Sequence, residues 1–180
     1  VLVIDMADPE HPVIANEFGM SFFQHAHTVQ IDMQTGKLYA DGTAQGMVIY
    51  DLAVDPVDPP KVTQWKGQGL SGVNGYVHDI YIKDGIGHAG LIYDGLYVLL
   101  DVSNLPAISV LGSKLTGQEF THSTWTTEDG KYAIVADEKG GPRNLEMWDV
   151  SDPTKPKTVA ELGQGPGTVG HNPYIRGNVA

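Results

Sequence analysis

Four histidines recur along the chain at nearly regular intervals, and each begins a short apolar stretch. They are His27, His78, His122 and His171, separated by 51, 44 and 49 residues. Neutral imidazole is the common protein ligand of divalent transition metals such as Zn, Cu, Fe, Ni or Mn. If the four histidines occupy equivalent positions of a repeated unit, pseudo-symmetry brings them to a common region. The spacing therefore predicts a candidate metal site with these four histidines as ligands.

Two carboxylates extend this candidate site. Asp79 directly follows His78, and Glu138 follows the second strand expected in the third unit. Carboxylates in such places orient a metal-bound imidazole or bind the metal themselves, so we expect both in the second shell. His25 lies two residues before His27 and would share its strand face if that segment is extended.

The repeated histidines have two other interpretations. Each ring could be architectural and bond a carbonyl group of a neighbouring strand or the carboxylate of a turn aspartate. Alternatively, the four could line a polar or catalytic pocket without a metal, although no residue can be assigned a catalytic role. All three interpretations stay open at the level of the sequence.

A second repeat indicates the elements that carry the histidines. Asp5, Asp51, Asp101 and Asp149 each end an apolar run and precede a Pro, at intervals of 46, 50 and 48 residues. Asp in this place caps backbone N–H groups of a turn and Pro presets φ, so we expect a structural role for them. Periods of 40–50 residues with several short strands are typical of β-propellers.

The apolar runs are short and are bounded by Gly, Asp, Asn or Pro, which indicates an all-β fold. We predict a β-propeller of four-stranded antiparallel blades, with the histidine-led strand innermost in each blade. The chain holds about four blades' worth of strands, three complete and one split between the termini. The complete blades are expected at 27–77, 78–121 and 122–170, and the split blade at 1–26 (third and fourth strands) and 171–180 (first strands).

Composition narrows the class of protein. The 180 residues include 22 acidic and 11 basic side chains, for a net charge of −11, and no Cys. The acidic balance argues against nucleic acid or an anionic membrane as partner. The absence of Cys excludes disulfides and thiolate metal sites. No apolar run approaches the roughly 20 residues of a transmembrane helix. Oligomeric state stays open.

The sequence also predicts the environments of the tryptophans and of two other histidines. Trp65, Trp125 and Trp148 are expected to pack between blades, and His11 is expected in an exposed turn. His88 lies in a Gly-rich stretch that we interpret as a flexible hairpin. Since the chain begins at Val1 in an apolar run, we expect it to be a processed or partial chain.

Together these motifs resemble a known family. The run Val1-Leu2-Val3-Ile4-Asp5 and its three later copies resemble the LVIVD repeat of surface propellers. The copies stand in register with the histidine-led segments, and this combination is similar to the choice-of-anchor B family over nearly the whole chain. The copy that contains Asp101 departs from the pattern, with Asn104-Leu105-Pro106 in place of Asp-Pro.

The resemblance implies a secreted or cell-surface propeller. We therefore expect a module that binds a protein or a small-molecule ligand at one propeller face. The alternative is a metal-binding protein, or a metal-dependent enzyme, that uses the histidine-lined face and a divalent transition metal.

Overall fold

We describe the protein from a computed structural model, which covers residues 1–163, 167–177 and 179–180. Residues 164–166 of the third predicted blade, and residue 178 of the final segment, lie outside the described residues. In the described part, the only helical element is one turn of 3-10 helix, η1 (Ile92–Asp94). No helix there has the length and apolar character needed to cross a membrane.

The strands form four antiparallel sheets, so the predicted all-β class is confirmed. The first sheet is the hairpin of β1 (Leu2–Asp5) and β2 (Val13–Glu17). The second contains β3 (Thr28–Asp32), β4 (Lys37–Thr43), β5 (Gly46–Asp51) and β6 (Lys61–Trp65). The third contains β7 (Asp79–Lys83), β8 (Ile86–Leu91), β9 (Leu96–Asp101) and β10 (Ser109–Leu115). The fourth contains β11 (Thr121–Thr126), β12 (Tyr132–Asp137), β13 (Leu145–Asp149) and β14 (Lys157–Glu161).

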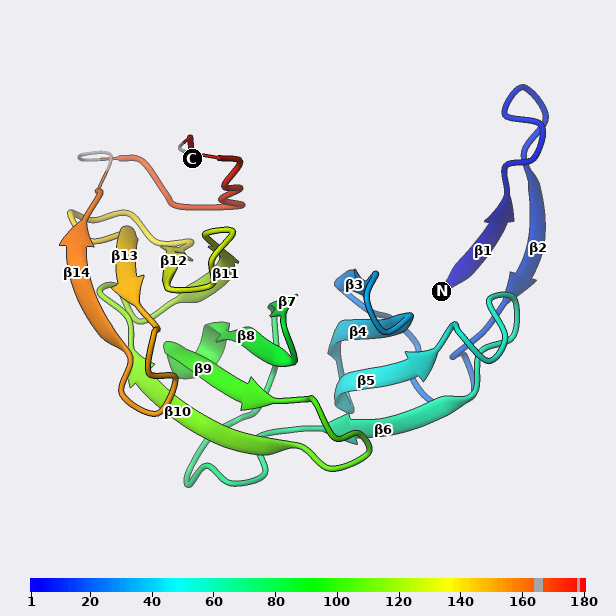
Figure 1. The fold of residues 1–180 in the computed structure, drawn as a ribbon, viewed down its shortest axis with the longest axis horizontal. Coiled ribbons are helices and arrows are strands. Elements are labelled where there is room, and N and C mark those ends of the chain that lie inside the picture. The colour runs from blue at the N-terminus through cyan, green and yellow to red at the C-terminus, as the bar shows by residue number, and fades with distance from the viewer. Residues whose placement is uncertain (164–166, 178) are drawn as a thin grey trace.

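Each four-stranded sheet is a simple meander in which sequential strands pair. The three sheets follow one another along an arc, with β3, β7 and β11 on its inner side and β6, β10 and β14 on its outer side (Figure 1). The inner strands meet across the sheets, since β7 contacts both β3 and β11. The expected order of strands within each unit is therefore observed.

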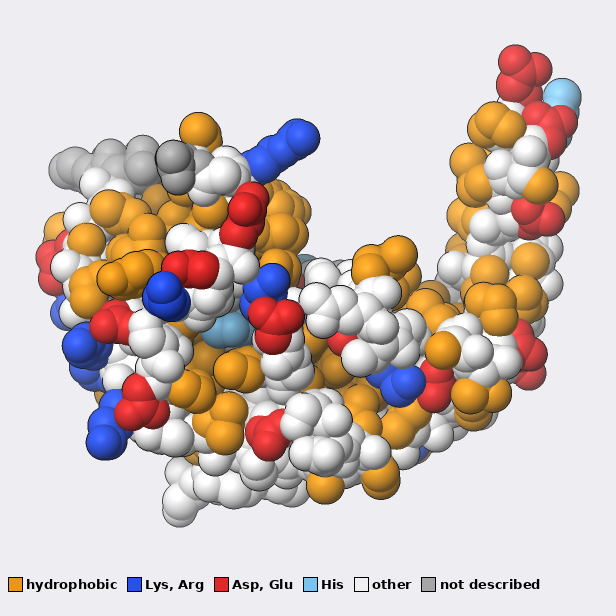
Figure 2. Space-filling view, viewed as in Figure 1, with side chains coloured by type: hydrophobic (Ala, Val, Ile, Leu, Met, Phe, Trp, Pro, Cys, Tyr) orange, Lys and Arg blue, Asp and Glu red, His pale blue; other side chains and the backbone are white. Residues whose placement is uncertain are grey.

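The two ends of the chain lie at opposite ends of this arc (Figure 1). The β1–β2 hairpin pairs only within itself, and segment 171–180 contributes one isolated bridge, Arg176 to Val179, among the described residues. The hairpin carries exposed apolar side chains, including Leu2, Ile4 and Ile14. Figure 2 shows hydrophobic side chains along its length. The structure is an open arc, and closure through a shared blade stays a prediction.

The four repeated aspartates have the structural role expected of them. In Asp5, Asp51, Asp101 and Asp149 the carboxylate accepts a hydrogen bond from the N–H two residues later, at 2.8 to 3.1 Å. These bonds stabilise the ionised form, and the N–H of Ser151 is the main reason why the pKa of Asp149 lies below its usual value. The aspartates therefore close the turn after the third strand of each unit.

Buried side chains hold neighbouring sheets together. Trp65 and Trp148 are almost completely buried, as predicted. Trp148 packs between the third and fourth sheets, where its ring meets the ring of Tyr97 edge to face at 5.4 Å. Trp125 also meets a neighbouring sheet, because its ring lies 4.3 Å from that of Tyr81, but it is only half-buried. It lines a cavity instead of joining the core.

The stretch around His88 forms the expected hairpin, because β7 pairs with β8, but His88 itself lies in a packed strand and not in a flexible connection. His88 lies in β8, is 2% exposed, and its Nδ1 is 2.6 Å from the hydroxyl oxygen of Tyr97. Burial lowers its pKa to about 3, so the ring is neutral at pH 7. The glycines around it serve packing: a Cβ at Gly90 would lie 2.8 Å from the carbonyl oxygen of His122. Glycine thus lets β11 approach β8 closely.

Candidate functional site

The four repeated histidines stand in a row on the inner side of the arc. The ring centroids of His27 and His78 are 4.2 Å apart, those of His78 and His122 are 4.1 Å apart, and those of His122 and His171 are 4.1 Å apart. Each ring contacts its neighbours in sequence, so the row is a column and not a circle around one point. The gathering expected from the spacing is observed, although its geometry differs from a four-ligand cluster.

The inner strands fix the backbone of this column. His27 and His78 directly precede β3 and β7, and His122 lies within β11. The N–H of His27 donates to the carbonyl oxygen of Asp41 at 2.7 Å, and the N–H of His78 donates to that of Gly90 at 2.8 Å. The middle two rings are buried, whereas His27 and His171 are exposed at the ends of the column.

A repeated hydrogen bond joins the units at the level of the column. Thr28 Oγ1 donates to the carbonyl oxygen of His78 at 3.1 Å, and Ser123 Oγ donates to that of His171. Between them, His78 Nδ1 lies 3.2 Å from the carbonyl oxygen of His122. A carbonyl oxygen only accepts, so Nδ1 carries the proton and Nε2 keeps its lone pair. This contact supports an architectural role for His78 and leaves its second nitrogen available.

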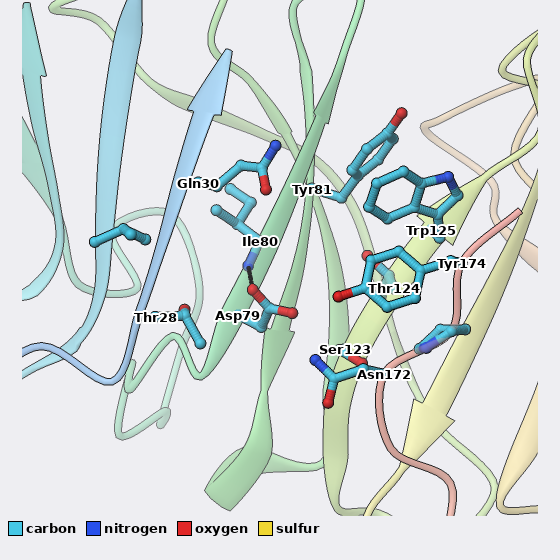
Figure 3. A pocket seen from close by; sticks show the side chains of 12 residues that line it. Thr28, Gln30, Asp79, Ile80, Tyr81, Ser123, Thr124, Trp125, Asn172 and Tyr174 are labelled. Atoms are coloured by element: carbon cyan, nitrogen blue, oxygen red, sulfur yellow. Dashed lines mark hydrogen bonds between the residues drawn. The ribbon is translucent and has the colours of Figure 1, made fainter. Parts of the chain in front are cut away.

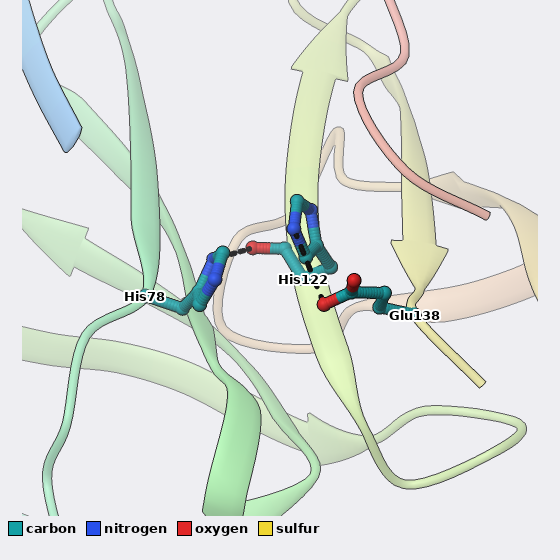
Figure 4. Close-up of side chains that lie close together, drawn as sticks. All are labelled: His78, His122 and Glu138. Atoms are coloured by element: carbon teal, nitrogen blue, oxygen red, sulfur yellow. Dashed lines mark hydrogen bonds and ion pairs between the residues drawn. The ribbon is translucent and has the colours of Figure 1, made fainter. Parts of the chain in front are cut away.

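Glu138 brings a carboxylate to the column. His78, His122 and Glu138 each offer one ligand atom, and these atoms all lie within 4.8 Å of one another (Figure 4). Glu138 Oε2 is 3.6 Å from His122 Nε2, and its Oε1 is 3.8 Å from His171 Nε2. Of the six residues predicted for the metal site, the structure therefore gathers these three closely, with His171 beside them.

The two buried histidines are neutral at pH 7. Burial, together with the neighbouring imidazoles, lowers the pKa of His78 and of His122 to about 4. The approach of Glu138 to His122 at 3.6 Å is therefore not an ion pair at pH 7, and it is too long for a hydrogen bond. A neutral imidazole with an available lone pair is the form that binds a metal.

A cavity of about 180 Å³ lies beside the column on the inner strands (Figure 3). The residues that line it are the three that follow each repeated histidine, namely Thr28, Val29 and Gln30, Asp79, Ile80 and Tyr81, Ser123, Thr124 and Trp125, and Asn172, Pro173 and Tyr174. Four successive units thus contribute the same positions to one hollow. The sequence pattern alone did not reveal this site, although its residues share the register of the histidines.

The lining forms a polar layer and an aromatic layer. The first residue after each histidine is polar in all four units: Thr28, Asp79, Ser123 and Asn172. The third residue is Gln30, Tyr81, Trp125 or Tyr174. Alternate residues of a strand point to the same face, so both sets can turn toward the cavity. Figure 3 shows the rings of Tyr81, Trp125 and Tyr174 in a row, with Asp79, Ser123 and Asn172 on one side of them.

Asp79 belongs to this cavity and not to the group of metal-ligand atoms around Glu138. Its Oδ1 accepts a hydrogen bond from the N–H of Ile80 at 3.0 Å, and burial raises the pKa of its carboxyl group. Asp41 on β4 is fully buried, and its two carboxyl oxygens have no hydrogen-bond partner among the described residues. Burial, and the nearby charge of Asp79, raise the pKa of Asp41 well above its usual value.

A second cavity, of about 550 Å³, lies under the C-terminal segment. Its walls are mostly apolar and include Ile134, Leu145, Leu162 and Val169. It is larger, but it holds few groups that could orient a ligand. The inner-strand cavity combines hydroxyl, amide, carboxyl and aromatic groups, which is the composition of a selective site.

The other histidines lie apart from the column. His25 is exposed in the segment before β3. His11 is exposed as predicted, with its Nδ1 2.9 Å from a carboxylate oxygen of Asp8 in the β1–β2 turn. Neither contributes a ligand atom to the group around Glu138.

A comparison with models of protein families finds no match to this chain. A search of curated protein sequences likewise finds none.

Proposed function

We propose that this protein is a ligand-binding module and that the inner-strand cavity is its binding site. The observation that carries the proposal is that four successive units place their equivalent tripeptides around one hollow of about 180 Å³. The repeated turn aspartates, in contrast, have a structural explanation. Function on a repeated β-fold resides in such sites and not in the fold itself. A small concave site favours a small molecule over a protein partner.

We also propose that the protein is a β-propeller of the choice-of-anchor B type. Its support is the register between the LVIVD-like runs and the histidine-led strands, and the arc in which three similar meanders present their first strands inward (Figure 1). In this proposal the protein is exported or attached to the cell surface, as the resemblance implies, and it binds its ligand on the axial side of the blades.

Trp125 provides a reporter for ligand binding. It is half-buried in the inner-strand cavity, whereas Trp65 and Trp148 are almost completely buried in the core. We expect at least one class in a panel of sugars, amines, carboxylates and amino acids to change the tryptophan fluorescence in a saturable way. Trp125→Phe should abolish this response, and Trp65→Phe should keep it. A panel without any saturable response, or a response that survives Trp125→Phe, would contradict the proposal.

A second candidate function is metal binding. The observation in its favour is the approach of His78, His122 and Glu138, whose ligand atoms lie within 4.8 Å of one another. Ligands at about 2.1 Å from a zinc ion stand roughly 3.4 Å apart in a tetrahedron, so a small inward movement suffices. Two imidazoles and a carboxylate are a ligand set that zinc accepts, with a fourth position left for water.

For metal binding we expect one zinc ion per chain in isothermal titration calorimetry. Glu138→Gln keeps the shape of the side chain but removes its charge, and we expect it to weaken zinc binding by about 10-fold or more. His122→Ala removes a ligand and should weaken binding further. His25→Ala is the matched control and should leave the affinity unchanged. If Glu138→Gln and His122→Ala bind zinc as tightly as the control His25→Ala, the metal site is not at this place.

A further inference from the structure

The hydrogen bonds around the inner-strand cavity leave three of its hydroxyl groups as acceptors. The hydroxyl protons of Thr28, Ser123 and Thr124 are donated to the backbone carbonyl oxygens of His78, His171 and His88. A hydroxyl group has one proton, so only the lone pairs of these three oxygens remain for a ligand. Toward a ligand these hydroxyl groups therefore act as acceptors, whereas the side-chain amides of Gln30 and Asn172 can donate.

The charged group among the residues that line the cavity is the carboxyl group of Asp79. None of the lining residues is Lys or Arg, and Asp79 forms no ion pair among the described residues. The nearby Asp41 is fully buried, and its two carboxyl oxygens have no hydrogen-bond partner among the described residues. A buried carboxylate without a counter-charge is costly, and a cationic ligand would relieve this cost.

Aromatic rings form the opposite side. The centroids of Tyr81 and Trp125 are 4.3 Å apart, and those of Trp125 and Tyr174 are 4.9 Å apart, so three rings stand in a row along the wall (Figure 3). The face of an aromatic ring is electron-rich and attracts a cation, most strongly when water is excluded. A volume of 180 Å³ corresponds to the share of about six water molecules in the liquid, which suits a small ligand.

We propose that the inner-strand cavity binds a small organic cation, with its ammonium group beside Asp79 and its alkyl groups against Tyr81 and Trp125. This inference rests on the proposed function, which makes the cavity a ligand site, and it adds the chemical class of the ligand. A neutral sugar fits less well, because it has no positive charge to compensate the carboxylate of Asp79 or to interact with the ring faces.

The test compares two probes of the same shape by isothermal titration calorimetry on the full chain. Choline carries a quaternary ammonium group, and 3,3-dimethyl-1-butanol is its neutral isostere. We expect choline to bind at least about 10-fold more tightly than the neutral alcohol, since only the cation gains from the carboxylate and the ring faces. Equal binding of the two probes would overturn the inference, and this comparison needs no variant.

Two variants locate the interaction. Asp79→Asn preserves the size of the side chain and should weaken choline binding by about 10-fold. Asp84→Asn is the matched control, because Asp84 is an exposed acid in the turn between β7 and β8 at a positive φ that Asn tolerates. It should change the affinity by less than about 2-fold. Choline binding that is indifferent to Asp79→Asn would contradict the assignment.

A third probe separates this inference from the proposed function. If methyl glucoside binds with a response that depends on Trp125 while choline does not bind, the cavity is a ligand site but the cationic class is wrong. If neither of these probes nor any other class in the panel binds, both proposals fail.

Discussion

Replacing Asp137 with alanine is expected to lower the free energy of unfolding by about 3 kcal/mol or more. Asp137 is 2% exposed at the end of β12. Its Oδ1 accepts hydrogen bonds from Thr116 Oγ1 at 2.6 Å and from the N–H of Phe120 at 3.1 Å, and its Oδ2 accepts one from the N–H of Gln118 at 2.8 Å. Alanine would remove the acceptor from the buried Thr116 hydroxyl group and from two partly buried N–H groups, and an unsatisfied buried donor costs about 1–3 kcal/mol.

The substitution should also disturb the positions of residues at the candidate site. The carboxylate of Asp137 organises residues 116–120, which lead into β11, and the N–H of Glu138 donates to the carbonyl oxygen of Phe120 at 3.1 Å. Urea unfolding followed by circular dichroism measures the effect. Asp129→Ala is the control: Asp129 also accepts two hydrogen bonds, but in an exposed turn where water replaces them. We expect Asp129→Ala to cost about 1 kcal/mol or less, and a similar cost for both variants would contradict this account.

The second large effect is expected from Gly90→Ala. A Cβ at this position in β8 would lie 2.8 Å from the carbonyl oxygen of His122 and 2.9 Å from that of Thr121. Both atoms belong to the backbone of the neighbouring sheet, so no side chain can rotate away. We expect a loss of about 2 kcal/mol in the free energy of unfolding, since overpacking of this kind forces the backbone to shift.

The same substitution should widen the histidine column. Displacement of β11 moves His122 away from His78, so zinc binding, where it occurs, should weaken together with stability. Gly140→Ala is the matched control, because its Cβ would meet only an ordinary contact at 3.6 Å from the carbonyl oxygen of Thr168. Chemical denaturation of both variants compares them. Unchanged stability in Gly90→Ala would show that the two sheets are not in close contact at Gly90.

Those features of the fold that follow from the repeat could be predicted from the sequence. The spacing of His27, His78, His122 and His171 placed them at equivalent positions, and their rings do follow one another at 4.1 to 4.2 Å. The turn role of the aspartates was predictable for the same reason, because local hydrogen bonding by Asp depends on only two following residues.

Features that depend on packing between sheets could not be predicted. Gly90 near His88 indicated flexibility. In the structure, however, the absence of a Cβ at Gly90 lets the backbone of β11 pack against β8. Asp79 and Glu138 were equal candidates beside the histidines. The structure directs Glu138 to the column and Asp79 to the cavity. Which face a carboxylate occupies depends on strand register and on bulges, such as the shift between Thr121 and Ser123, which the sequence pattern does not reveal.

The central claim is that the inner-strand cavity is the ligand site, and fragment soaking tests it most directly. Crystals of the protein would be soaked with small organic fragments of positive, negative and zero charge, and the electron density would be compared at both cavities. The account predicts that fragments collect between Asp79 and the rings of Tyr81 and Trp125. Fragments that collect only in the larger apolar cavity beside Leu162 and Val169, with water alone in the inner-strand cavity, would contradict it.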